Sequence, residues 1–159
     1  MDISLESLGT DTLWKKRLIF SAVFIEANKL QTAFDRNDGD VTSKQWLLLV
    51  IASSFPEPPT LTAVGELMGC SRQNVKKIAV ILEKKGYLVL VNDLNDKRSL
   101  CIEITEKYKM LSAKMESETD DVMKNLFSEF SDEQVDELFN GIIKLSKGID
   151  ALDKYFQRK

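Results

Sequence analysis

The chain has 159 residues, of which 43% are hydrophobic and 30% charged, and its formal net charge is −3. This length and composition are typical of one soluble globular domain whose apolar core needs no disulfide or metal to hold it. The sequence contains no histidine, which excludes Ser-His-Asp and Cys-His catalysis and histidine-based zinc sites. It also lacks a phosphate-binding glycine loop and a dinucleotide fingerprint. We therefore expect neither an enzyme nor a bound cofactor or metal.

The sequence also bears on where the protein works. No apolar run approaches the roughly 20 residues that span a bilayer. Residues 1–10 lack the basic and apolar stretches of a secretory signal. The two cysteines, Cys70 and Cys101, are too few for a disulfide framework. We expect a cytoplasmic protein with no membrane partner.

Two helices are predicted in the first third of the chain. Residues 11–36 are rich in apolar side chains at helical spacing and contain no glycine or proline, and residues 37–40 have the composition of a turn. Thr42 and Gln45 then have the spacing of a capping box, which predicts the start of a second helix. An apolar run follows, so this helix should be central. All three prolines of the chain lie in residues 54–59 and end it.

Two shorter helices should come next. The first covers residues 62–68 and is stopped by Gly69, and the second is N-capped by Ser71 and closed by Gly86. Apolar residues of the second helix recur at helical spacing and should face inward. Its first turns are polar instead, with Arg72, Gln73, Asn74, Lys76 and Lys77. Two short helices joined by a tight turn form a helix-turn-helix.

A β-hairpin is predicted after these helices. Residues 87–91 and 100–104 are β-rich, and the polar connection between them ends in Lys97 and Arg98. A helix-turn-helix followed by a hairpin is a winged helix. Residues 60–109 carry nine basic and six acidic side chains, whereas the segments on both sides are net acidic. Such a basic patch suits nucleic acid, although a solvated helix face and a polar hairpin tip would look the same.

Two long helices complete the chain. An amphipathic helix is expected from Thr105 to Phe130, and a second capping box at Ser131 and Gln134 starts the last one. Apolar residues of this last helix alternate at spacings of three and four, which is a heptad seam that needs a partner helix. The partner is either a second copy of the chain or another helix of the same chain. The residues of this seam are Val135, Leu138, Ile142, Leu145, Ile149, Leu152 and Phe156.

This order of elements resembles the MarR family of winged-helix transcriptional regulators. The layout of nearly the whole chain is similar, and the motifs match in residues 60–109. The segment Asp93-Leu94-Asn95-Asp96-Lys97-Arg98-Ser99, followed by Ile104-Thr105, is similar to the wing pattern D-x-x-D-x-R of that family. The resemblance implies a mainly α fold in a single chain of residues 1–159. Residues 42–109 would form a winged helix-turn-helix lobe, and residues 11–36 with 110–157 a helical dimerisation region.

The resemblance also implies a function. The chain would be a homodimeric DNA-binding regulator on a pseudo-palindromic operator, acting as a repressor that a small, for example aromatic, ligand releases. Arginine binds guanine and Gln or Asn binds adenine in the major groove, hydroxyls at helix starts can bind phosphate, and a wing arginine can enter the minor groove. Asp96 is expected to hold an arginine of the wing or helix in place. The residues expected at the DNA are Thr62, Ser71, Arg72, Gln73, Asn74, Lys76, Lys77, Lys97 and Arg98.

Several alternatives stay open at this point. Phe20, Phe24, Trp46 and Phe55 would either line a cleft for the ligand or be ordinary core aromatics. Cys70, beside a helix start, would be either a reactive thiol or a packed hydrophobic-staple residue. The acidic ends of the chain and its pI of about 5.1 also fit a winged-helix protein-interaction module without specific DNA binding.

Overall fold

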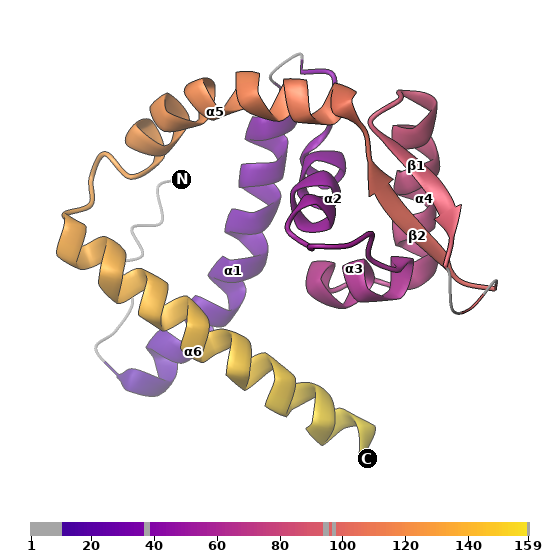
Figure 1. The fold of residues 1–159 in the computed structure, drawn as a ribbon. Helices are drawn as coiled ribbons and strands as arrows, with labels where there is room; N and C mark the ends of the chain where they lie inside the picture. Colours follow the sequence, from indigo (N-terminus) through magenta and orange to yellow (C-terminus); the bar gives the residue numbers. More distant parts are fainter. Residues whose placement is uncertain (1–10, 37–38, 94–95, 97, 159) are drawn as a thin grey trace. The chain divides into compact units, whose positions relative to one another are not determined.

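The structure is a computed structural model that describes residues 11–36, 39–93, 96 and 98–158, apart from the side chains of 116–118. Two compact units divide after Lys109. No helix within these described ranges is long and apolar enough to cross a membrane. The elements, labelled in Figure 1, are α1 (Thr12–Asp35), α2 (Ser43–Ser53), α3 (Leu61–Met68), α4 (Arg72–Lys84), β1 (Leu88–Asn92), β2 (Leu100–Ile104), α5 (Glu106–Leu126) and α6 (Asp132–Gln157). This is the mainly α winged helix-turn-helix that the sequence predicts.

The helix starts follow the local sequence signals closely. Thr42 and Ser131 form complete capping boxes, and Ser71 caps α4, so these three predictions are confirmed. The start of α3 was placed wrongly, because Thr60 is the N-cap and its hydroxyl accepts the Ala63 N–H at 3.1 Å. Thr62 therefore lies inside the first turn of α3.

The end of α5 also differs from the prediction. This helix ends at Leu126 and not at Phe130. The Phe130 N–H donates to the Phe127 carbonyl at 2.9 Å, and the two phenyl rings pack edge-on with their centroids 5.6 Å apart. This short turn leaves Ser131 free to start α6.

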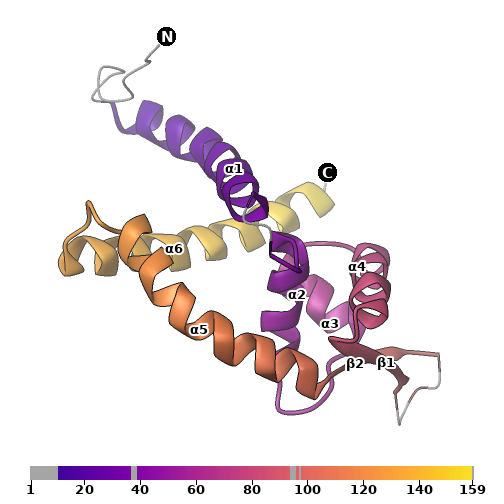
Figure 2. The same ribbon diagram turned by 90° about the horizontal axis from the view of Figure 1, so that it is seen from above.

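The core of the first unit lies between α2, α3, α4 and the hairpin. The helix α2 packs against both α3 and α4, as its apolar run predicts, and β1 lies against α4 in both views (Figures 1 and 2). Full burial of each large apolar side chain contributes roughly 1.5–3 kcal/mol. The largest side chains that are fully buried are Leu48, Leu49, Leu61, Val64, Val75, Leu82, Leu88 and Ile102.

The hairpin is antiparallel and pairs Leu88 with Ile104 and Leu90 with Ile102. Cross-strand partners share a face, so these four residues form the face that contributes Leu88 and Ile102 to the core. The opposite face carries exposed Val89. Cys101, on that same opposite face, is nevertheless buried, so burial on the second face is confined to one end of the hairpin.

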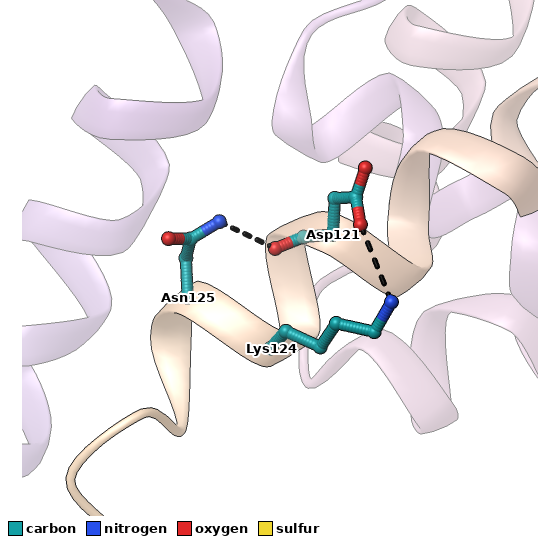
Figure 3. Close-up of polar contacts among 3 residues, drawn as sticks. All are labelled: Asp121, Lys124 and Asn125. Carbon is teal, nitrogen blue, oxygen red and sulfur yellow. Dashed lines mark hydrogen bonds and ion pairs between the residues drawn. The ribbon is translucent and has the colours of Figure 1, made fainter.

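The second unit contains most of α5 and all of α6. Near the end of α5, the Asn125 side-chain amide donates to the Asp121 carbonyl at 2.7 Å, and Lys124 lies 3.4 Å from the Asp121 carboxylate (Figure 3). These contacts are local to one turn of the helix. In α6, every residue of the seam except Val135 is exposed, including Ile142 and Ile149 at 55% each. In the part of the chain that the structure describes, this apolar stripe, the α6 seam, is therefore exposed.

A polar cluster around Tyr87 joins three segments of the first unit. The buried Tyr87 hydroxyl donates to the Asp40 carboxylate. The Lys85 ammonium donates to the Asp40 carbonyl, and it also reaches the Gln45 side chain at 3.3 Å. The Lys107 ammonium lies 4.5 Å from the centre of the Tyr87 ring and donates to the Lys85 carbonyl at 2.6 Å. The segment after α1, the end of α4 and the start of α5 are thus linked at Tyr87.

Replacing Tyr87 by phenylalanine should lower the free energy of unfolding by about 1–2 kcal/mol at pH 8, because a buried hydrogen bond to a carboxylate is lost. Burial and the Asp40 carboxylate raise the pKa of Tyr87 to about 12 from 10.0. The folded state therefore holds this proton more tightly than the unfolded state does. Its stabilisation is complete below pH 10 and is lost as the pH rises through about 12.

Urea unfolding at pH 8, 10 and 11 measures this effect as the difference between wild type and Tyr87→Phe. The difference should shrink from pH 10 upward. A difference that stays constant over this range would show that the Tyr87 proton is not linked to folding.

Candidate nucleic-acid interface

The helix α4 presents a continuous polar surface at its N-terminal end. Ser71 caps it by accepting the Asn74 N–H at 3.3 Å. On the opposite side Val75, Ala79 and Leu82 are fully buried, so packing fixes the rotation of the helix about its axis. In the first two turns, residues 72–78, this rotation leaves five polar residues exposed: Arg72, Gln73, Asn74, Lys76 and Lys77.

The turn between α3 and α4 depends on two glycines. Gly69 ends α3 with φ 64°, in the left-handed region that favours glycine. A Cβ added to Gly65 would lie 2.7 Å from the Cys70 carbonyl oxygen, so the turn can approach α3 only where there is no side chain. The sequence pattern predicted the role of Gly69. It carried no signal for Gly65, because a glycine inside a helix usually has no such contact.

The wing tip is held by hydrogen bonds around Asp96. Its carboxylate accepts the Arg98 N–H at 3.0 Å and the Ser99 hydroxyl at 2.9 Å, and its own N–H donates to Asp93 at 3.0 Å. Asp96 was expected to hold an arginine of the wing or helix in place, and in the structure its carboxylate contacts the wing arginine, Arg98, through the backbone N–H. The Arg98 side chain is exposed. Lys97, also expected at the DNA, lies outside the described residues.

The remaining helix-start residues predicted at the DNA are exposed as well. Thr62 lies in the first turn of α3 and Ser71 directly before α4. The structure therefore brings Ser71 next to the polar turns of α4 and places Thr62 on the preceding helix of the same helix-turn-helix.

The two cysteines have different surroundings. Cys101 is buried on β2, and its thiol lies 3.5 Å from an Asp93 carboxylate oxygen. Burial, and then this carboxylate, raise the pKa of the Cys101 thiol above its ordinary value. Cys70 is half-buried, and both thiols are free. Cys101 therefore has the surroundings of an inert structural thiol.

The four aromatic residues considered for a ligand cleft do not share one environment. Phe20 and Phe24 are each 61% exposed on α1, with ring centroids 5.3 Å apart. Trp46 instead packs on Phe34, at 5.5 Å, and Phe55 is half-buried. Phe20 and Phe24 are thus not core residues within the part of the chain that the structure describes.

Several solved structures have the same arrangement of helices and wing. The chain has the MarR-family winged-helix fold. A MarR/EmrR family transcriptional regulator from Acinetobacter sp. ADP1 is 24% identical, with a TM-score of 0.73 over 86% of this chain and 97% of that one. The regulator BldR from Sulfolobus solfataricus is 16% identical, with a TM-score of 0.77 over 87% and 99%. A MarR transcriptional regulator from Methanosarcina mazei Go1 is 21% identical, with a TM-score of 0.75 over 85% and 99%.

No protein-family model matches the sequence, and no curated protein matches it. At these identities the similarity to MarR-type structures establishes the fold. What the chain binds has to be argued from its own residues.

Proposed function

We propose that this protein is a sequence-specific DNA-binding transcriptional regulator. The observation that carries the proposal is the exposed polar face of α4, held in one orientation by the buried residues Val75, Ala79 and Leu82. An α-helix fits the major groove, and the N-terminal residues of a recognition helix contact base edges there. The wing arginine, Arg98, suits the narrow and strongly negative minor groove nearby.

The exposed side chains of the helix-turn-helix have two different roles in the proposed binding, contact with bases and contact with phosphates. Arg72 is suited to guanine, and Gln73 and Asn74 are suited to adenine. Lys76 and Lys77 supply charge for phosphates, which adds affinity without reading sequence. Thr62 and Ser71 offer a hydroxyl or backbone N–H group to phosphate at helix starts. The face thus contains both the groups that read bases and the groups that bind the backbone.

The proposed active form is a homodimer that binds a pseudo-palindromic operator. The uncovered α6 seam supports it, because a heptad stripe of exposed Leu, Ile and Phe is stable only against a partner. Two copies would bring two α4 helices to successive major grooves, about 34–36 Å apart. The dimerisation region would be formed by residues 11–36 and 110–157, and the DNA-binding lobe by residues 42–109.

We also propose that the regulator is a repressor released by a small aromatic ligand. The exposed pair Phe20 and Phe24 supports this, because two exposed rings packed edge-to-face offer an apolar aromatic surface that can bind an aromatic acid. Trp46 and Phe55 complete the proposed set. Titration of aromatic acids into the operator complex should dissociate it, and Phe20→Ala with Phe24→Ala should raise the ligand concentration needed.

Selection of binding sites from a random duplex-DNA pool at about 0.15 M salt tests the main proposal. An enriched inverted repeat is the expected result, and it would define the half-sites. If the protein is folded and dimeric but the selection enriches no sequence, the proposal is contradicted. That result would favour a winged-helix protein-interaction module.

Replacing Arg98 by alanine should weaken binding to the selected operator by roughly 1–3 kcal/mol, because the minor-groove contact is lost. Fluorescence anisotropy with labelled operator measures the change. Arg158→Ala, at an exposed arginine that follows α6 and lies outside both proposed regions, is the control and should bind as wild type does. Unchanged affinity of Arg98→Ala would show that the wing does not contact the groove.

A further inference from the structure

The two strands of the wing have outer edges that need hydrogen-bond partners. In an antiparallel ladder, hydrogen-bonded and non-hydrogen-bonded pairs alternate. The Thr105 N–H donates to the Tyr87 carbonyl and the Asp93 N–H to the Ser99 carbonyl, so these are hydrogen-bonded pairs. The pair of Leu90 with Ile102 falls between them and is not hydrogen-bonded. Both of its N–H groups therefore point away from the hairpin.

These two N–H groups have different partners. The Ile102 N–H donates to the Pro59 carbonyl at 2.9 Å, beside a backbone bridge between Thr60 and Cys101. The Leu90 N–H donates to the side chain of Glu83, with 2.8 Å between the Leu90 nitrogen and Oε1. The outer edge of β2 is thus bound by a backbone carbonyl, that of Pro59. The outer edge of β1 is bound at Leu90 by a side chain instead, the carboxylate of Glu83.

Glu83 belongs to the same helix as the residues proposed to read bases. It lies nine residues after Asn74 in α4, about 13 Å along a rigid helix at 1.5 Å per residue. A hydrogen bond to an ionised acceptor is stronger than a hydrogen bond between neutral groups. Leu90 lies in β1, the strand that continues into the wing tip. The contact therefore couples the position of the wing to that of the recognition helix.

We propose that Glu83 is a positioning residue, which fixes the wing strand to α4 so that Arg98 reaches the minor groove while Arg72 to Asn74 lie in the major groove. This inference rests on the proposed function. Glu83 has no direct part in binding, since a carboxylate is repelled by phosphate. Its effect on affinity passes through Arg98.

Operator binding by two Glu83 variants tests the first consequence. Glu83→Ala removes the acceptor and should lower operator affinity about 10-fold, within the range of one groove contact. Glu83→Gln keeps an oxygen that accepts the Leu90 N–H and should stay within about 3-fold of wild type. Glu103→Ala, an exposed carboxylate on β2, controls for the loss of negative charge and should bind no more weakly than wild type.

A double-mutant cycle tests whether Glu83 acts through Arg98. In the Arg98→Ala background, Glu83→Ala should cost less than about 2-fold, because the contact that it positions is already gone. Full additivity of the two losses would overturn the proposal. Equal losses in Glu83→Gln and Glu83→Ala would overturn it as well, since charge and not the hydrogen bond would then matter.

Amide hydrogen exchange tests the link without DNA. The Leu90 amide should be protected in wild type and Glu83→Gln, and should exchange at least about 10-fold faster in Glu83→Ala, while the Leu48 region in the core keeps its protection. Unchanged exchange at Leu90 would overturn the proposal. If no operator is selected but Leu90 loses protection as expected, the proposed function fails while the link between Glu83 and the wing stands.

Discussion

Simultaneous replacement of Arg72, Gln73 and Asn74 by alanine is expected to lower operator affinity by about 100-fold or more. Each bidentate contact to a base is worth about 1–3 kcal/mol of discrimination, and the three side chains occupy the first turn of α4, where a recognition helix meets the bases. The helix itself should remain folded. Alanine has the highest helix propensity, and Ser71 caps α4 through the Asn74 backbone N–H and not through its side chain.

The measurement compares affinity for the selected operator with affinity for a scrambled duplex at about 0.15 M salt. The triple variant should bind the operator and the scrambled duplex with equal affinity. Replacing Lys76 and Lys77 by alanine is the matched control. Loss of phosphate contacts should weaken binding to both duplexes equally and reduce the salt dependence of the affinity. A triple variant that still distinguishes operator from scrambled DNA would place sequence reading elsewhere in the molecule.

Placing glutamate at Ile142 and Ile149 is expected to convert the protein to monomers. Both positions lie in the exposed α6 seam, and a dimer would bury two added charges from each copy in an apolar interface without partners. Operator affinity should fall by about 100-fold or more, because a monomer contacts one half-site only. Sedimentation equilibrium gives the mass, and anisotropy gives the affinity.

The control for this pair adds the same charge to the other side of α6. Asn140 and Ala151 lie about 160–180° around the helix from Ile142 at 100° per residue, and both are exposed. Asn140→Glu with Ala151→Glu should therefore remain dimeric and bind DNA. A stable dimer of Ile142→Glu with Ile149→Glu would show that the seam is not the contact between copies.

Much of the secondary structure could be predicted because its signals are local. The side chains of Thr42, Ser71 and Ser131 each accept the backbone N–H of the residue three positions later. Because both partners are close in sequence, the spacing alone predicts the hydrogen bond. The predicted start of α3 at Thr62 was wrong because two threonines, at positions 60 and 62, both suit a helix start. In the structure Thr60 is the N-cap and also forms a backbone bridge with Cys101 of the hairpin, a contact that local sequence does not show.

The exposed residues of the candidate interface could be predicted from the sequence, but the hydrogen bonds that hold the wing tip could not. The exposed face of α4 follows from the spacing of Val75, Ala79 and Leu82, because one apolar stripe defines the opposite side of a helix. The position of Arg98 follows from the wing motif. The backbone contacts of Asp96 do not, since a carboxylate near a hairpin tip has several N–H groups within reach.

The order of the elements, most of their boundaries, the polar face of α4 and the apolar seam of α6 are all encoded locally, since periodicity and capping act within a few residues. The way in which the wing and α4 are joined depends on tertiary contacts. Glu83 meets Leu90 seven residues away, and Tyr87 meets Asp40 forty-seven residues away. Such pairs depend on the packed core, because packing and not local propensity brings these groups within hydrogen-bond distance.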